Sequence, residues 1–141
     1  MNLVNPVNPV NPVRMLGKLG EADLARVLAH AAIFALPARY EPFGLMPVEA
    51  ALSGCALVLG DIPSLREVWA DAADFVRPDD HEALYEAVGA LIAAPARLHE
   101  RAQAARARAS MYTPERMAAA YETLYESLAP TRHTRSVACA S

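Results

Sequence analysis

Two glutamates, Glu41 and Glu49, lie eight residues apart with a glycine, Gly44, between them. An ionised carboxylate accepts two hydrogen bonds at once, so each glutamate suits a pair of sugar hydroxyls. The amides of Gly44 and Leu45 would open a helix, and a helix N-terminus attracts phosphate. Because carboxylates repel phosphate, the pattern suggests a phosphate flanked by two polyols, as in a nucleotide sugar. The spacing alone is also compatible with a loop glutamate and a helical glutamate that bind nothing.

The segments around this motif alternate between short apolar runs and helical patterns. The apolar runs predict buried strands at 33–36, 56–59 and 75–76, and the end of another strand at Met15 and Leu16. Periodicity and capping signals predict helices over 21–32, 45–53, 63–69 and 97–108, and two more that begin at Asp80 and at Thr113-Pro114. This order indicates an α/β, Rossmann-like fold, in which helices flank a parallel sheet.

Ligands of such sheets bind beyond the carboxyl ends of the strands. Two loops occupy that position, residues 38–44 and residues 60–66, and the first of them contains the glutamate motif. Functional residues are therefore expected in these two loops.

Composition excludes several classes of protein. The 141 residues include 13 Lys+Arg and 16 Asp+Glu, so no basic excess is available for nucleic acid. A hydrophobic content of 54% excludes global disorder. No apolar run approaches the roughly 20 residues of a transmembrane helix, and no signal peptide is apparent.

The cysteines and histidines predict neither a disulfide nor a metal site. Cys55 lies in an apolar stretch and Cys139 near the end of the chain, so both are expected to be free thiols, which favours the cytoplasm. Core packing is the expected role of Cys55. The four histidines have no metal-ligand spacing to the cysteines.

Three segments are expected along the chain. Residues 1–13 form a low-complexity leader, because Asn-Pro-Val repeats three times over 5–13 and proline at this spacing disfavours helices and central strands. Residues 14–129 form one globular domain. Residues 130–141 form a flexible tail.

The string Glu41-Pro42-Phe43-Gly44-Leu45 followed by Glu49 resembles the E-x7-E signature of the retaining GT-B glycosyltransferases of family 4, also described as group 1. Further stretches match that family in order: the strand at 56–59, Asp61-Ile62-Pro63-Ser64-Leu65-Arg66-Glu67-Val68, and Asp71-Ala72-Ala73. The resemblance covers residues 14–129 and implies the nucleotide-sugar-binding second domain of a GT-B fold, incomplete at its N-terminal side.

This resemblance implies a role for each matching residue. Glu41 corresponds to the catalytic-site glutamate beside the transferred sugar, and Glu49 to the one that holds the ribose hydroxyls. The backbone at Phe43, Gly44 and Leu45 would face the donor sugar and the diphosphate. The implied donor is a UDP-, GDP- or ADP-sugar, with no metal and no further cofactor.

Two departures bear on activity. The basic residues with which the family grips the diphosphate lie upstream of the matching region and are not found here, and neither Lys18 nor Arg39 stands at their motif. The acceptor-binding domain is missing as well. The expectation is a glycosyltransferase fragment that is inactive alone. The alternative is a non-catalytic nucleotide-binding or assembly module that pairs with a separate chain.

Two further patterns have plain structural interpretations. Four arginines of the 97–108 helix, Arg97, Arg101, Arg106 and Arg108, are expected to form a solvated face rather than a binding surface. The last helix carries an apolar stripe formed by Met117, Ala120, Tyr121, Leu124, Tyr125 and Leu128. This stripe is expected to be core, or an exposed patch where the surface that covers it is missing.

Overall fold

A computed structural model describes residues 13–128, so most of the predicted leader and all of the predicted tail lie outside the described residues. Within this range the sheet has three parallel strands in the order β1-β2-β3. The strands are β1 (Ile33–Leu36), β2 (Ala56–Gly60) and β3 (Asp74–Val76). Ile33 pairs with Ala56, and Val58 pairs with Asp74. Every residue of the central strand is buried, as expected for a continuous apolar run in a parallel sheet.

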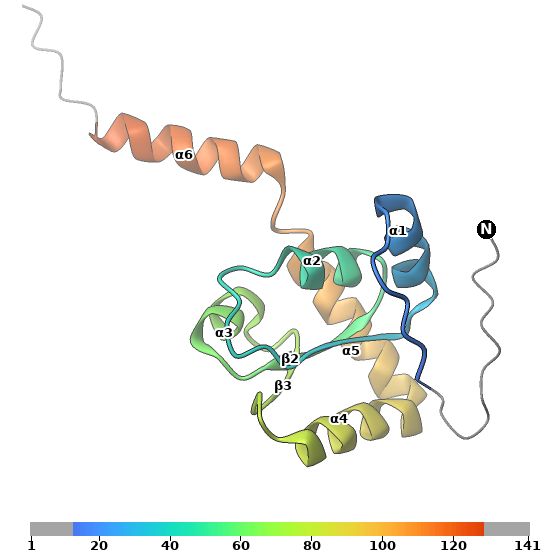
Figure 1. The fold of residues 1–141 in the computed structure, drawn as a ribbon. Helices are drawn as coiled ribbons and strands as arrows, with labels where there is room; N and C mark the ends of the chain where they lie inside the picture. Colours follow the sequence, from blue (N-terminus) through green and yellow to red (C-terminus); the bar gives the residue numbers. More distant parts are fainter. Residues whose placement is uncertain (1–12, 129–141) are drawn as a thin grey trace, which may run out of the picture.

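Helices cover both faces of this sheet (Figure 1). Leu57 and Leu59 of β2 pack on one side against α1 (Glu21–His30), α2 (Leu45–Leu52) and α3 (Pro63–Trp69). Ala56 and Val58 pack on the other side against α4 (His81–Ala93). The fifth helix, α5 (Pro95–Ala109), contributes side chains to both clusters. The two clusters confirm the predicted α/β class, with helices on both faces of a parallel sheet.

Most predicted elements are confirmed, with small differences at their ends. Helix α3 spans the predicted residues, and the Asp80 carboxylate caps α4 by accepting a hydrogen bond from the amide of Ala83 over 2.9 Å. One expectation is wrong, because residues 15 and 16 form no strand.

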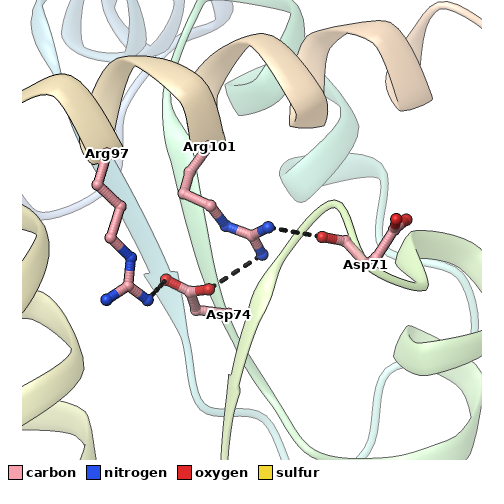
Figure 2. A network of polar contacts seen from close by, with 4 residues as sticks. All are labelled: Asp71, Asp74, Arg97 and Arg101. Carbon is pink, nitrogen blue, oxygen red and sulfur yellow. Dashed lines mark hydrogen bonds and ion pairs between the residues drawn. The ribbon is translucent and has the colours of Figure 1, made fainter.

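The prediction of a solvated arginine face is only partly right, because Arg97 and Arg106 are exposed while Arg101 and Arg108 are partly buried. Figure 2 shows the contacts of Arg97 and Arg101. Arg101 Nη2 lies 3.0 Å from Asp74 Oδ1, and its Nη1 donates to the Asp71 carbonyl over 2.7 Å. Arg97 reaches the other Asp74 oxygen over 3.3 Å. Arg108 Nε donates to the carbonyl of Val68 over 2.6 Å. These contacts hold α5 against the segment that runs from α3 into β3.

The last described helix, α6 (Pro114–Leu128), projects away from the sheet (Figure 1). The Thr113 hydroxyl caps it, accepting from the amide of Arg116 over 3.3 Å, as the sequence predicts. No residue of α6 is buried, so the core interpretation of its stripe is wrong and the exposed patch is observed. Between residues 13 and 128 no helix is both long and apolar enough to cross a bilayer.

Candidate functional site

The β1–α2 loop, residues 37–44, carries most of the predicted site and follows the carboxyl end of β1. Its last residue, Gly44, has a φ of +87°, a left-handed conformation that favours glycine. A side chain there would also crowd the ring of Pro47, with a Cβ 3.2 Å from Cγ. Pro47 fits the first turn of α2, where an amide would have no helical acceptor. Glycine and proline thus explain why the chain turns sharply into α2 at this point.

The N-terminus of α2 leaves backbone amides available. Among residues 13–128, the amides of Leu45 and Met46 have no hydrogen-bond acceptor, and no side chain caps the helix. The first amide of the helix to bond within it is that of Val48, which donates to the carbonyl of Gly44 over 3.4 Å. Two free amides and the positive end of the helix dipole form an environment suited to an anion.

The two glutamate carboxylates lie on either side of these amides along the chain. Glu41 is partly buried in the loop, and Glu49 is exposed in the second turn of α2. Within the described part of the chain, neither carboxylate is hydrogen-bonded or ion-paired. All five predicted site residues thus lie on one continuous loop-and-helix segment, although Phe43, Leu45 and Glu49 are exposed while Gly44 is buried.

The β2–α3 loop supports the β1–α2 loop directly. Ser64 Oγ donates to the main-chain carbonyl of Glu41 over 2.6 Å. Gly60, at the end of β2, packs so closely on Ala38 that a Cβ would lie 2.9 Å from its amide nitrogen and closer still to its carbonyl oxygen. The two loops predicted to carry function are therefore held against each other at the carboxyl edge of the sheet.

The segment at the end of β3 and after it is joined to the β1–α2 and β2–α3 loops. The amide of Asp61 donates to the carbonyl of Val76 over 2.7 Å, and Arg39 forms an ion pair of 2.7 Å with Asp79. Arg39 lies at the surface.

Arg66 is engaged by its neighbours rather than available to an anion. Its guanidinium forms two hydrogen bonds with the Asp61 carboxylate, one of them over 2.8 Å, and lies 4.6 Å above the centre of the Phe75 ring. The hydrogen bond from Arg66 lowers the pKa of Asp61 below its ordinary value. Arg66 therefore links the β2–α3 loop, through Asp61, to β3, through Phe75.

An aromatic contact ties the β1–α2 loop to the end of α5. The Phe43 and Tyr112 rings meet edge to face with centres 5.3 Å apart, and the Tyr112 hydroxyl donates to the carbonyl of Val68 over 2.8 Å. A mainly apolar pocket of about 540 Å³ lies beside this pair. Its lining residues come from the loop, α2 and the α5–α6 junction: Phe43, Leu45, Met111, Tyr112, Thr113, Pro114, Arg116 and Met117.

Sequence reasoning predicted a functional loop at residues 60–66 but gave no supporting role to Gly60 or Ser64 within it, and it missed Tyr112. For Gly60 a signal existed, because a glycine that ends a buried strand often marks a close backbone approach. No local pattern could reveal the partners of Ser64 and Tyr112, since both bonds join segments distant along the chain. Among the described residues, no group of three or more potential ligands is arranged to hold a metal ion.

Comparisons with known proteins bear on this arrangement. The family model described as "Glycosyl transferases group 1" matches residues 4–108. Glycogen synthase of Mycobacterium tuberculosis (strain CDC 1551 / Oshkosh) is 39% identical over 88 residues, which are 61% of this chain and 21% of that protein. Alpha-maltose-1-phosphate synthase of the same strain is 36% identical over 93 residues, 60% of this chain and 24% of that protein.

A solved structure has a similar fold. Sucrose-phosphate synthase from Thermosynechococcus elongatus superimposes with a TM-score of 0.71 at 27% sequence identity, over 79% of this chain and 29% of that one. The chain thus spans less than a third of the length of each of these proteins.

Proposed function

Since the chain belongs to the glycosyl transferases group 1 family and has the fold of a GT-B glycosyltransferase domain, we propose that its β1–α2 segment binds a nucleotide-diphosphate sugar. The parent reaction is transfer of the glycosyl group with retention of anomeric configuration. The observation that carries the proposal is the N-terminus of α2, where, among residues 13–128, the amides of Leu45 and Met46 have no acceptor. Along the chain these amides lie between Glu41 and Glu49, whose carboxylates have no partner among the same residues.

Each group has a separate task in this proposal. The amides at Gly44, Leu45 and Met46 receive the diphosphate, whose charge also interacts favourably with the dipole of α2. The Glu49 carboxylate accepts hydrogen bonds from the ribose hydroxyls, and the Glu41 carboxylate accepts them from the sugar. No metal is required, because amides and the helix dipole supply the stabilising positive potential as the leaving diphosphate develops charge.

The supporting contacts fit this use of the loop. Ser64 holds the backbone of Glu41, and Tyr112 holds the ring of Phe43, so the groups that would face the sugar are positioned before a ligand arrives. A site organised in advance loses less conformational entropy on binding. We further propose that the described residues supply only the donor side of the reaction, so that the purified chain does not turn over a nucleotide sugar alone.

The test is a titration of the purified chain with UDP, GDP and ADP, followed by ligand-observed NMR. One nucleotide is expected to bind weakly, and Glu49→Ala is expected to weaken it about tenfold or more, since a hydrogen bond to a charged group contributes about 1.5–3 kcal/mol. Glu122→Ala, which removes an exposed glutamate from α6, is the matched control and should bind normally.

Three outcomes would each contradict a part of the proposal. If none of the nucleotides binds to the folded chain, the alternative of an assembly module that pairs with a separate chain is favoured. If Glu49→Ala binds as well as the wild type, the ribose role does not apply here. Steady release of nucleoside diphosphate from a nucleotide sugar would overturn the claim that the chain is inactive alone.

A further inference from the structure

Tyr40 presents an aromatic ring that the described part of the chain leaves uncovered. The residue lies in the β1–α2 loop, directly before Glu41, and its side chain is 83% exposed. Two other rings near this edge of the sheet are engaged, since Phe43 meets a second ring and Phe75 lies under a guanidinium. Among residues 13–128, the side chain of Tyr40 has neither a hydrogen bond nor a ring contact.

The main chain on both sides of Tyr40 is held in place although its ring is free. Ala38 packs against the end of β2, and the Arg39 side chain pairs with a carboxylate in the segment after β3. The carbonyl of Glu41 accepts a hydrogen bond from the first turn of α3. A tyrosine on a fixed backbone loses little conformational entropy when it packs against a ligand.

The same three contacts indicate where the ring of Tyr40 lies. They hold the loop toward β2 and β3, yet the segments that follow these strands leave the ring exposed. The ring therefore projects into solvent at the carboxyl edge of the sheet, which is the edge where ligands of parallel α/β sheets bind.

The order of groups along the β1–α2 segment indicates which part of a ligand the ring would meet. In the proposed function the ribose lies at Glu49, the diphosphate at the first amides of α2 and the transferred sugar at Glu41. Tyr40 comes next in this direction, so along the chain it is adjacent to the sugar and distant from the ribose.

We propose that the Tyr40 ring packs against the transferred sugar of the donor, an inference that rests on the proposed function of this segment. A hexose carries hydroxyl groups around its rim and C–H groups on its faces. The Glu41 carboxylate accepts hydrogen bonds from the rim, and the Tyr40 ring contacts one apolar face. The ring thus adds affinity for the sugar and none for the nucleotide.

Binding of a nucleoside diphosphate and of its glucose ester, measured by ligand-observed NMR, tests this contact. The pairs are UDP and UDP-glucose, GDP and GDP-glucose, and ADP and ADP-glucose, and the pair whose nucleotide binds is used. Tyr40→Ala is expected to weaken binding of the glucose ester about two- to tenfold, the range for one aromatic contact, and to leave the free nucleotide unchanged. Tyr40→Phe keeps the ring and should bind both ligands normally.

Tyr85→Ala is the matched control, because it removes a tyrosine of similar exposure, 75%, from α4. It should bind both ligands as the wild type does. In Tyr40→Ala, saturation-transfer signals of the glucose C–H protons should also fall relative to those of the base. Circular dichroism and the fluorescence of the buried Trp69 would verify that each variant is folded.

Two results would overturn the role of Tyr40 alone. Equal weakening of the nucleotide and its glucose ester would show that the ring does not act on the sugar, and unchanged binding of both would show that it acts on neither. A loss in Tyr40→Phe as large as in Tyr40→Ala would assign the contact to the hydroxyl instead of the ring. Each of these results requires a wild type that binds the nucleotide. A wild type that binds no nucleotide contradicts the proposed function itself, and the role of Tyr40 with it.

Discussion

The hydroxyl of Ser64 donates a hydrogen bond to the main-chain carbonyl of Glu41 over 2.6 Å, joining the loops that follow two neighbouring strands. Ser64→Ala should lower the free energy of unfolding by about 0.5–1.5 kcal/mol, the usual contribution of one such bond. It should also speed amide hydrogen exchange in residues 41–45.

Urea denaturation and exchange measured by NMR would check both effects. Ser110→Ala is the control, because Ser110 bonds to the carbonyl of Ala107, three residues away, at an exposed helix end. Unchanged exchange in residues 41–45 after Ser64→Ala would show that the bond does not position the loop.

Gly60 is expected to tolerate no side chain. A Cβ there would overlap the backbone of Ala38, so Gly60→Ala must displace the β1–α2 loop or the end of β2. A loss of about 1–3 kcal/mol in unfolding free energy is expected. Gly89→Ala in α4 is the control, since its Cβ would meet no atom within 4 Å and alanine favours the helix by about 0.5–1 kcal/mol. The midpoint temperature of thermal unfolding should therefore fall for Gly60→Ala and rise for Gly89→Ala.

Arg101 should contribute more to stability than Arg97, although both pair with Asp74. The Arg101 and Asp74 side chains are 21% and 20% exposed, whereas Arg97 is 52% exposed. Arg101→Met is expected to cost about 1–3 kcal/mol, because it also removes the bond to the Asp71 carbonyl. Arg97→Met should cost at most about 1 kcal/mol. Equal losses in urea denaturation would show that burial does not distinguish the two pairs.

Cys55 should make stability depend on alkaline pH. Its side chain is fully buried, and desolvation raises the pKa of the thiol above its ordinary value of 9.0. The folded state therefore holds the proton more tightly than the unfolded state. The contribution of this thiol to the free energy of unfolding is complete below pH 9 and is lost as the pH rises through the pKa of the folded state.

Chemical unfolding of the wild type and of Cys55→Ala, at pH 7 and above pH 9, tests this prediction. The wild type should lose more stability than the variant over this interval. In a Cys139→Ser background, Cys55 should react with a thiol reagent only on unfolding. Rapid labelling of the folded chain would contradict its burial.

The sequence by itself determined the features that depend on neighbouring residues. Pro63 at the start of α3, Asp80 at the start of α4 and Gly44 before α2 each act within one turn of chain, so their signals are local. The apolar runs of β1 and β2 predicted a parallel sheet, and the ordered motifs from Glu41 to Ala73 predicted the family that the comparisons confirm. The roles of Glu41 and Glu49 remain predictions.

Only the tertiary structure decided which distant groups meet. The bond from Ser64 to Glu41, the contact of Phe43 with Tyr112 and the pairing of Arg101 with Asp74 join segments far apart in sequence, and each depends on how the helices pack on the sheet. The exposure of α6 was likewise decided only by the tertiary structure. An apolar stripe has the same sequence pattern whether or not a surface covers it, so its burial follows from the position of the helix rather than from its residues.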